Sequence, residues 1–368
     1  MRKINTFLAA TLAAGVLGGT VARADVIVGL AGPITGPVAS FGEQLKKGAE
    51  KAVADLNAKG GVLGQHVQLY VGDDACDPKQ AVSVANDMVA KKVAVVIGHF
   101  CSGSSIPASS VYAESNVIEI SPASTNPVYT ERKLPNVFRV CGRDDAQGPT
   151  GAKYIAKHFK GENVAVVDDK QTYSKGLADA AAAELKKLGM KVVYRDEITA
   201  GEKDYSPLVT KLKELKVAVL YYGGYHPEAG LIVRQMREQG LKTVLMGGDA
   251  LDDPAFWSIT GPAGQGTLMT FGPDATKNPA NAKLVAWFKS QNYDAQTYTL
   301  YSYAEVQAWA EAAQKAGTFD SAKVEASLRK NKFSTTLGKI GFDAKGDVTA
   351  PGYIVYEWKN GKADYAPK

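Results

Sequence analysis

The sequence predicts an α/β protein built as two similar halves, each a mainly parallel β-sheet covered by helices. Apolar, β-branched runs recur along the chain and end abruptly, which is typical of strands covered on both faces. Strand and helix patterns also alternate from the start. The 344 residues that follow a predicted leader exceed what one hydrophobic core usually supports, so two domains are expected.

Polar and aromatic residues follow five of these runs directly. The runs are Val93 to Gly98, Val117 to Ile120, Val164 to Val167, Val217 to Tyr222 and Val244 to Met246. Parallel sheets bind ligands beyond the carboxyl ends of their strands. The residues at these ends offer hydroxyls, backbone N–H groups, aromatic rings and the carboxylate of Asp249, which together suit a small zwitterion. None of the ends offers an obvious nucleophile with a base.

The first half reads as βαβαβ. Val26 to Leu30 is the first strand, and a helix follows whose apolar face is Phe41, Leu45, Ala49, Val53 and Leu56, stopped by Gly60 and Gly61. Val67 to Val71 is the next strand. Pro78 to Lys91 is a helix with proline in its first turn, and the strand from Val93 completes the unit.

The pattern starts again after a predicted loop, Gly142 to Pro149. A helix from Thr150, the strand at Val164 and a helix over Ser174 to Leu188, closed by Gly189, form the next units. After Gly272 the regular alternation of strand and helix patterns stops. Helices are predicted at Pro279 to Ser290 and Ala304 to Ala316, with a last strand at Tyr353 to Trp358. We expect the late helical pair to cross back and complete the first lobe.

Residues 1–24 have the pattern of a signal peptide. Arg2 and Lys3 give a positive start, the stretch from Phe7 to Val21 is apolar but short, and Ala22, Arg23 and Ala24 form an A-x-A cleavage site. Cleavage is expected after Ala24. The remaining chain would carry 40 basic and 38 acidic residues, a balance that gives no electrostatic case for nucleic acid. No later apolar stretch reaches the length of a membrane helix.

Three cysteines remain in an exported chain, which can keep disulfides. Cys76 and Cys101 each lie just past a predicted strand of the same βαβ unit, so a bridge between them is expected, with free buried thiols as the alternative. Cys141 is interpreted as a small buried residue. The absence of a C-x-x-C motif does not favour a redox or zinc role.

Several long motifs resemble one family over the whole predicted exported chain. They are YVGDDACDPKQAVSVAND (70–87), VIGHFCSGSSIPAS (96–109), SPAST (121–125), DDKQTYSKGLA (168–178), ITAGEKDYSPLV (198–209) and YYGGYHPEAG (221–230). The chain resembles the periplasmic leucine/isoleucine/valine-binding proteins of ABC importers. The resemblance implies the type I periplasmic binding protein fold, with two Rossmann-like lobes, three crossovers and a ligand cleft between the lobes. It places 25–143 with 273–352 in lobe 1, and 144–272 with 353–368 in lobe 2.

The resemblance also implies roles for individual residues. Ser102 and Thr125, with Ser124 beside them, would bind the ligand carboxylate, and the Ala123 carbonyl would accept from the ligand ammonium. The second lobe would contribute Tyr173, Tyr225 and Asp249, and the side-chain pocket would be lined by Phe41, Phe100 and Tyr298. The Cys76 to Cys101 bridge matches the disulfide of the family. From the residues alone, the hydroxyls could instead be helix caps, Asp249 an N-cap for Leu251 to Ile259, Tyr225 a packing residue at the cleft edge and Phe100 plain core.

Two departures from the family bear on the ligand. Asp249 stands where the family typically has a glutamate, and its shorter side chain leaves room beside an α-ammonium. Phe100 stands where an aliphatic residue is common and, with Tyr298, narrows the subsite for an isobutyl group. These substitutions shift the expected ligand from leucine towards valine, alanine, proline or γ-aminobutyrate.

The leading hypothesis is a monomeric periplasmic binding protein that captures a neutral amino acid and delivers it to an inner-membrane ABC permease, without catalysis, cofactor or metal. A ligand sensor coupled to a chemoreceptor is an alternative, and a secreted amidase or hydrolase is a remote one. The four histidines His66, His99, His158 and His226 accompany no G-x-S-x-G or H-E-x-x-H motif. Asp73 and Asp74 are interpreted as a solvated loop or helix cap rather than a metal site.

Overall fold

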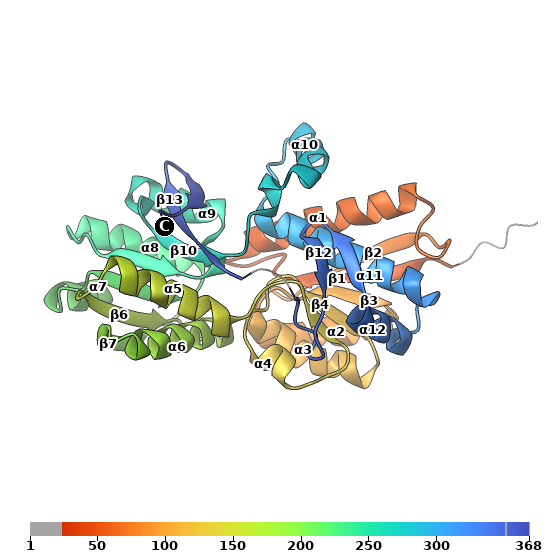
Figure 1. The fold of residues 1–368 in the computed structure, drawn as a ribbon, viewed down its shortest axis with the longest axis horizontal. Helices are drawn as coiled ribbons and strands as arrows, with labels where there is room; N and C mark the ends of the chain where they lie inside the picture. The colour runs from red at the N-terminus through yellow and green to blue at the C-terminus, as the bar shows by residue number, and fades with distance from the viewer. Residues whose placement is uncertain (1–23, 350–351, 368) are drawn as a thin grey trace, which may run out of the picture.

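The computed structural model describes residues 24–349 and 352–367. The predicted signal peptide, residues 1–24, lies outside these ranges except for its last position. Two α/β lobes lie side by side along the long axis of the molecule (Figure 1). We call them the first lobe, built on a five-stranded sheet, and the second lobe, built on a seven-stranded sheet.

The sheet of the first lobe has the order β2-β1-β3-β4-β5, and all its strand pairs are parallel. Its strands are β1 (Val26–Gly32), β2 (Val67–Asp73), β3 (Val95–Gly98), β4 (Ile118–Ser121) and β5 (Val137–Arg139). The helices of this lobe are α1 (Ala39–Ala58), α2 (Pro78–Ala90), α3 (Ser102–Glu114), α4 (Val128–Glu131), α11 (Thr297–Ala316) and α12 (Ser321–Lys330). Helices α1 and α11 pack against each other, so a late segment of the chain lies in the first lobe.

The sheet of the second lobe has the order β14-β13-β10-β9-β8-β6-β7. Its strands are β6 (Asn163–Asp168), β7 (Lys191–Glu197), β8 (Val219–Gly223), β9 (Val244–Gly247), β10 (Leu268–Phe271), β13 (Ile354–Lys359) and β14 (Lys362–Tyr365). Only the pairs that involve β13 are antiparallel. Its helices are α5 (Asp144–His158), α6 (Thr172–Lys187), α7 (Ser206–Glu214), α8 (His226–Glu238) and α9 (Pro254–Thr260).

The chain passes between the lobes three times. It crosses after β5, again between β10 and α11, and a third time after the hairpin of β11 (Lys332–Thr335) and β12 (Gly338–Gly341). Helix α10 (Ala282–Ser290), on the second crossing, projects from the body in Figure 1. This arrangement is the predicted type I periplasmic binding protein fold.

Two predicted boundaries are wrong. The loop expected at Gly142 to Pro149 is helical from Asp144 onward. Gly148 serves close packing rather than a turn, because a Cβ there would lie 2.7 Å from the backbone nitrogen of Ala181 on α6. Helix α11 begins at Thr297 instead of Ala304. Its first residues, TYTLYSY, are mostly threonine and tyrosine, but all are buried, and tertiary packing overrides the weak helix propensity of these residues.

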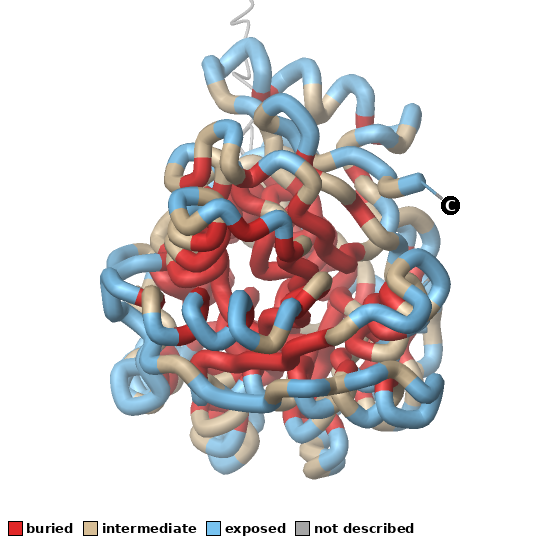
Figure 2. Tube along the Cα trace, turned by 90° about the vertical axis from the view of Figure 1, so that its left-hand side faces the viewer, coloured by how far each residue is buried: buried red, intermediate tan, exposed pale blue. Residues whose placement is uncertain are grey.

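The strands of both sheets form the buried interior, and the helices expose their outer faces. Figure 2 shows this for the end of the molecule formed by the second lobe. The strands β3, β4, β8 and β10 are buried along their whole length, which explains the apolar runs of β3 and β8 and leaves Glu119 of β4 in the interior. Within residues 24–349 and 352–367, no helix is both long and apolar enough to span a membrane.

Candidate ligand-binding cleft

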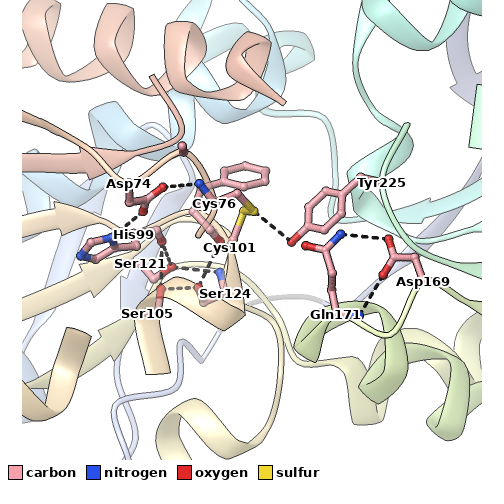
Figure 3. Close-up of a disulfide and its surroundings, with 12 residues drawn as sticks. Asp74, Cys76, His99, Cys101, Ser105, Ser121, Ser124, Asp169, Gln171 and Tyr225 are labelled. Atoms are coloured by element: carbon pink, nitrogen blue, oxygen red, sulfur yellow. Dashed lines mark hydrogen bonds and ion pairs between the residues drawn. A yellow bond between two sulfur atoms is a disulfide. The ribbon is translucent and has the colours of Figure 1, made fainter. Parts of the chain in front are cut away.

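A disulfide stands at the base of the cleft on the first-lobe side. Cys76 and Cys101 are bonded, with a Cα to Cα distance of 5.6 Å, so the predicted bridge is confirmed (Figure 3). It joins the loop after β2 to the turn between β3 and α3. Across the cleft, the hydroxyl of Tyr225 lies 3.9 Å from Cys76 Sγ. The bridge therefore fixes the turn that carries Phe100 and Ser102.

The hydroxyl groups predicted for the ligand carboxylate are buried around this turn, but they differ in what they contact. Ser124 Oγ donates to the Phe100 carbonyl at 3.1 Å and lies 2.5 Å from Ser105 Oγ, so it is used within the lobe. Ser102 Oγ accepts from the Asn126 N–H at 3.3 Å. Thr125 Oγ1 is buried and has no hydrogen-bond partner among the described residues. Of the three hydroxyls, that of Thr125 makes no hydrogen bond within the described residues, and it faces the buried carboxyl of Asp144.

The loop that supplies these hydroxyls is itself held in place. The Asp144 N–H donates to the Thr125 carbonyl at 2.9 Å, and Ser121 Oγ accepts from the Ser124 N–H at 2.9 Å. Ala123 lies between Ser121 and Ser124 in the sequence and is buried. Ser102 is the first residue of α3, whose leading N–H groups have no partner within the helix. The turn thus offers donors suited to an anion.

Asp74 corrects the interpretation of residues 73 and 74 as a solvated loop or cap. Its side chain is fully buried, and its Oδ2 lies 2.5 Å from His99 Nδ1. His99 Nε2 in turn lies 3.0 Å from the Tyr112 hydroxyl, and Asp74 Oδ1 accepts from the Cys76 N–H at 2.8 Å. The sequence alone does not reveal this pairing, because Asp74 and His99 follow two different strands and are 25 positions apart.

Asp249 follows β9 and lies at the interface between the lobes. Its Oδ1 accepts from the Tyr173 hydroxyl at 2.9 Å and from Gln147 Nε2 at 2.9 Å, and its Oδ2 accepts from the Tyr298 hydroxyl at 2.5 Å. Tyr298 comes from the first lobe and the other two donors from the second. The N-cap of α9 is Asp253, so the alternative capping role does not fall on Asp249.

Asp249 is 5% exposed and forms no ion pair with any described basic side chain. Burial raises its pKa, while the hydrogen bonds from Tyr298, Gln147 and Tyr173 act in the opposite direction. Those hydrogen bonds favour the ionised form. A buried carboxylate with only neutral donors is an incomplete arrangement, and a ligand ammonium would complete it.

Aromatic rings from both lobes close the space beside Asp249. Phe41 stacks on Phe100 with 4.3 Å between ring centroids, and Tyr298 meets Phe100 edge-on at 4.8 Å. His226, on the second lobe, packs edge-on against Phe41 at 5.3 Å. Tyr173 and Tyr225 lie 5.2 Å apart. The structure therefore brings together all the aromatic residues predicted for the pocket.

Polar contacts join the two lobes across the cleft. Gln44 Nε2 on α1 donates to Asp253 Oδ2 at 2.9 Å, and Asn126 Nδ2 donates to the Thr172 carbonyl at 2.8 Å. Gln44, Asp253 and Asn126 are all buried. The lobes are thus closed upon the cleft in this structure.

A cavity with an empty volume of about 370 Å³, partly open to solvent, extends from Asp249 towards the crossovers. Residues of all three crossovers line it, together with Asp249, Tyr298 and Tyr301; these are Val140, Cys141, Gly142, Gly272, Gly352 and Tyr353. Cys141 is free and buried, as predicted, and burial raises the pKa of its thiol. The cavity therefore borders the segments that join the lobes, and of the predicted site residues only Asp249 and Tyr298 line it.

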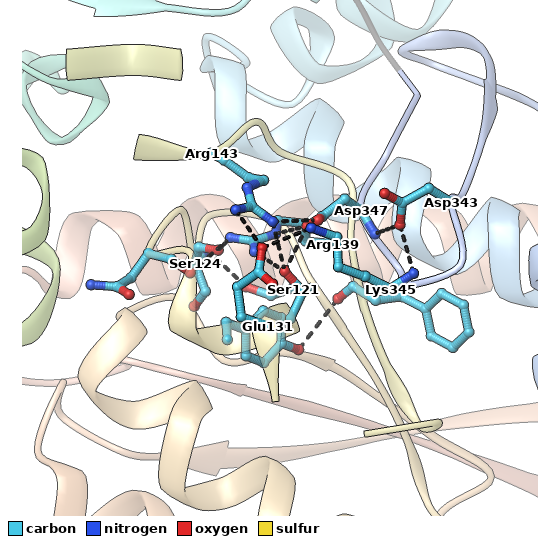
Figure 4. A network of polar contacts seen from close by, with 12 residues as sticks. Ser121, Ser124, Glu131, Arg139, Arg143, Asp343, Lys345 and Asp347 are labelled. Atoms are coloured by element: carbon cyan, nitrogen blue, oxygen red, sulfur yellow. Dashed lines mark hydrogen bonds and ion pairs between the residues drawn. The ribbon is translucent and has the colours of Figure 1, made fainter. Parts of the chain in front are cut away.

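A buried ion-pair network fixes the first and third crossovers (Figure 4). Arg139 is fully buried; its Nε lies 2.6 Å from Asp347 Oδ1, and its Nη1 donates to the Ser124 carbonyl at 2.6 Å. Arg143 Nη1 contacts the other oxygen of Asp347 at 2.8 Å. Burial alone would raise the pKa of Asp347, but the two guanidinium groups more than offset it and lower that pKa. Because Arg139 donates to the Ser124 carbonyl, the network connects these two crossovers to the loop that contains Thr125.

Three residues of the cleft were not predicted. Gln147 lies on the part of α5 that the sequence indicated as loop, and Asp144 begins that helix. Both oxygens of Asp144 are buried without a hydrogen-bond partner among the described residues, and burial raises its pKa well above the usual value. His226 follows Tyr225 in the quoted motif, and its position next to a predicted site residue is the only signal that could have indicated it.

The described residues contain no cluster of three or more histidine, cysteine, aspartate or glutamate side chains that could hold a metal ion. Two closed α/β lobes with a buried polar cleft define a protein that encloses a small molecule between its lobes. The chain belongs to the periplasmic binding protein family, whose model matches residues 25–363.

Individual relatives agree with that assignment. The chain is 49% identical over 362 residues to the Leu/Ile/Val-binding protein homolog 1 of Brucella melitensis, covering 98% of this chain and 97% of the relative. It is 49% identical over 342 residues to an amino acid binding protein of Pseudomonas aeruginosa, covering 92% of this chain and 91% of the relative.

Solved structures show the same fold. A leucine-binding protein from Thermotoga maritima superposes with a TM-score of 0.86 at 30% identity, covering 93% of this chain and 98% of that one. The branched-chain amino acid transporter substrate-binding protein LivJ of Streptococcus pneumoniae, in complex with isoleucine, gives a TM-score of 0.84 at 25% identity, covering 92% and 98%.

Proposed function

We propose that this protein is the periplasmic substrate-binding component of an ABC importer, which captures a neutral amino acid and delivers it unchanged to an inner-membrane permease. The names of its relatives support the amino-acid class and the transport role. In this proposal the protein acts as a monomer, and residues 25–143 with 273–352 close on 144–272 with 353–368.

The observation that carries the proposal is the carboxylate of Asp249 at the closed interface, which is buried and has no ion-pair partner among the described residues. Three neutral donors orient it, and it provides the negative charge that an ammonium requires. Thr125 and the first turn of α3 provide donors for a carboxylate. One anionic and one donor-rich group in the same cleft suit a zwitterion.

The aromatic residues favour a small or linear ligand. The ring of Phe100 is packed between Phe41 and Tyr298, where an isobutyl side chain would need room. Valine, alanine, proline and γ-aminobutyrate therefore fit the proposal better than leucine. We expect Phe100→Leu to improve leucine binding by about 1 to 3 kcal/mol, the usual effect of a methylene or two in an apolar pocket. A leucine affinity unaltered by Phe100→Leu, measured by calorimetry, would show that this ring does not limit the pocket.

A ligand screen tests the proposed function. Thermal shift and calorimetry with the twenty amino acids and γ-aminobutyrate should identify at least one stabilising ligand, because binding to the folded state raises stability by mass action. Chromatography of the ligand after incubation should recover it unchanged. Absence of binding across the panel, or consumption of the ligand, would contradict the proposal.

A further inference from the structure

Two glutamates lie beneath the turn between β3 and α3. Glu119 is on β4 and Glu305 is on α11, and the side chains of both are fully buried. The Gly98 N–H donates to Glu305 Oε1 at 3.2 Å, and the next N–H, that of His99, donates to Glu119 Oε1 at 3.4 Å. Two elements far apart in the sequence thus hold two consecutive peptide groups.

The second oxygen of each glutamate lacks a hydrogen-bond partner. Glu119 Oε2 and Glu305 Oε2 are buried and unpaired within the described part of the chain. Neither side chain forms an ion pair with a described basic residue. Two ionised carboxylates in this position would have no ion-pair partner, so their burial would cost more free energy than burial of the neutral acids.

We propose that Glu119 and Glu305 are neutral carboxylic acids that position the Phe100 to Ser102 turn for an anionic ligand group, and that loss of their protons at alkaline pH weakens binding. The inference rests on the proposed function, in which this turn receives the ligand carboxylate. A negative charge beneath the turn would repel that carboxylate, whereas a neutral acid still accepts the backbone N–H.

The surroundings of the pair favour the neutral form. The groups that face Glu119 are Ser105, Tyr129 and Arg132, together with the His99 N–H; the Ser302 hydroxyl and the Gly98 N–H face Glu305. Burial raises the pKa of both acids well above the usual value, and these groups oppose the shift without offsetting it. Glu119 adds its own repulsion to Glu305. Asp74 and Tyr112 are occupied by the His99 ring.

Helix α11 connects the pair to the other end of the proposed ligand site. Tyr298, which donates to Asp249, and Glu305 are seven residues apart on α11, so they lie two turns apart on one face. The same helix therefore positions both the acceptor of the Gly98 N–H and the hydroxyl that donates to Asp249. We describe both glutamates as positioning residues, because they act through the turn rather than on the ligand.

Alanine and glutamine variants test the positioning role. Glu305→Ala should lower the affinity for the best ligand of the screen about tenfold at pH 7, because the Gly98 N–H loses its acceptor. Glu305→Gln should restore most of that loss, since an amide oxygen also accepts this bond. Glu114→Gln, at an exposed position on α3, is the matched control and should bind like the wild type. Equal losses in the Ala and Gln variants of Glu305 would overturn the positioning role of a neutral acid.

A pH series tests whether loss of the protons of Glu119 and Glu305 weakens binding. Between pH 7 and 9.5 the wild type should lose about tenfold more affinity than the Glu119→Gln/Glu305→Gln double variant; titration of the ligand amine affects both proteins equally and cancels. Parallel affinity profiles would overturn the inference.

A ligand-free measurement separates this inference from the proposed function. A pKa raised in the folded state makes stability fall as pH rises above the unfolded value of about 4.3, by up to tenfold in the unfolding equilibrium per pH unit for each glutamate. In denaturant titrations the wild type should show a steeper fall with pH than the double Gln variant, which keeps the smaller fall due to other buried carboxyls such as Asp144 and Asp249. Parallel stability profiles would overturn the neutral pair even if ligand binds, whereas a ligand panel without binding would overturn the proposed function alone.

Discussion

Replacing Asp249 by asparagine removes the negative charge from the cleft and keeps the shape of the side chain. The hydroxyls of Tyr173 and Tyr298 can rotate to accept from the new amide, so we expect the lobes to close as before. What is lost is the charge proposed to balance the ligand ammonium. The variant therefore isolates the electrostatic part of binding.

The magnitude follows from the burial of Asp249. An ammonium and a carboxylate 4 Å apart interact by about 4 kcal/mol at an effective dielectric constant of about 20. Truncating one partner of a buried, hydrogen-bonded charge pair costs about 2 to 5 kcal/mol. We therefore expect Asp249→Asn to weaken binding by about 2 to 4 kcal/mol, or roughly 30-fold to 1000-fold in Kd.

Isothermal titration at pH 7 measures this change. Asp294→Asn, an exposed change of the same kind, is the control and should leave Kd unaltered. Because burial raises the pKa of Asp249, wild-type affinity should also decline as pH falls through that raised pKa, and the asparagine variant should show no such decline. An affinity of Asp249→Asn within about threefold of wild type would refute the assignment of the ammonium site.

Three further predictions concern other parts of the structure. Thr125→Ala should weaken binding by about tenfold to a hundredfold, since hydrogen bonds to charged groups contribute roughly 1.5 to 3 kcal/mol; calorimetry with an unaffected Kd would exclude this hydroxyl. Replacing Cys76 and Cys101 by serine should lower the free energy of unfolding by about 3 kcal/mol for a loop of 25 residues, and a urea midpoint equal to that of wild type would contradict this. Asp347→Asn should cost about 3 kcal/mol by leaving Arg139 buried without its partner, and because the pKa of Asp347 is lowered in the folded state, the wild-type advantage should begin to shrink as pH falls below the unfolded value of about 4 and should vanish only below the lowered folded pKa; a denaturant series that shows the same difference at pH 3 and pH 7 would disprove it.

Much of the architecture could be predicted because its signals are local. The strand at Val164 and its neighbour β8 are buried on both faces, so their apolar runs stand out in the sequence. The first helical face, from Phe41 to Leu56, matches α1 because its period is that of a helix. The cysteine pairing was predictable because both thiols follow strands that turned out to flank β1 in the same sheet.

Other features depend on contacts that no local pattern encodes. Gly148 and Pro149 have the composition of a loop, yet Gly148 allows α5 and α6 to approach closely. Thr297 begins a helix because the whole first turn of α11 is buried. Glu305 reaches the Gly98 peptide across 207 positions of sequence. Such pairings are fixed by tertiary packing, and the roles proposed for the site residues remain predictions.

The third crossover has a consequence for how the polypeptide assembles. β10 has β13 as one of its two neighbours, and β13 and β14 follow every other strand of this sheet in the sequence. Until they arrive, β10 presents an unpaired apolar edge, which is the kind of surface that recruits other chains. The second lobe therefore cannot finish folding while its C-terminal residues are still missing. Truncation before residue 354 should yield aggregation rather than a smaller soluble fragment, and a C-terminal fusion should be tolerated only if it leaves the β13 to β14 hairpin free to dock.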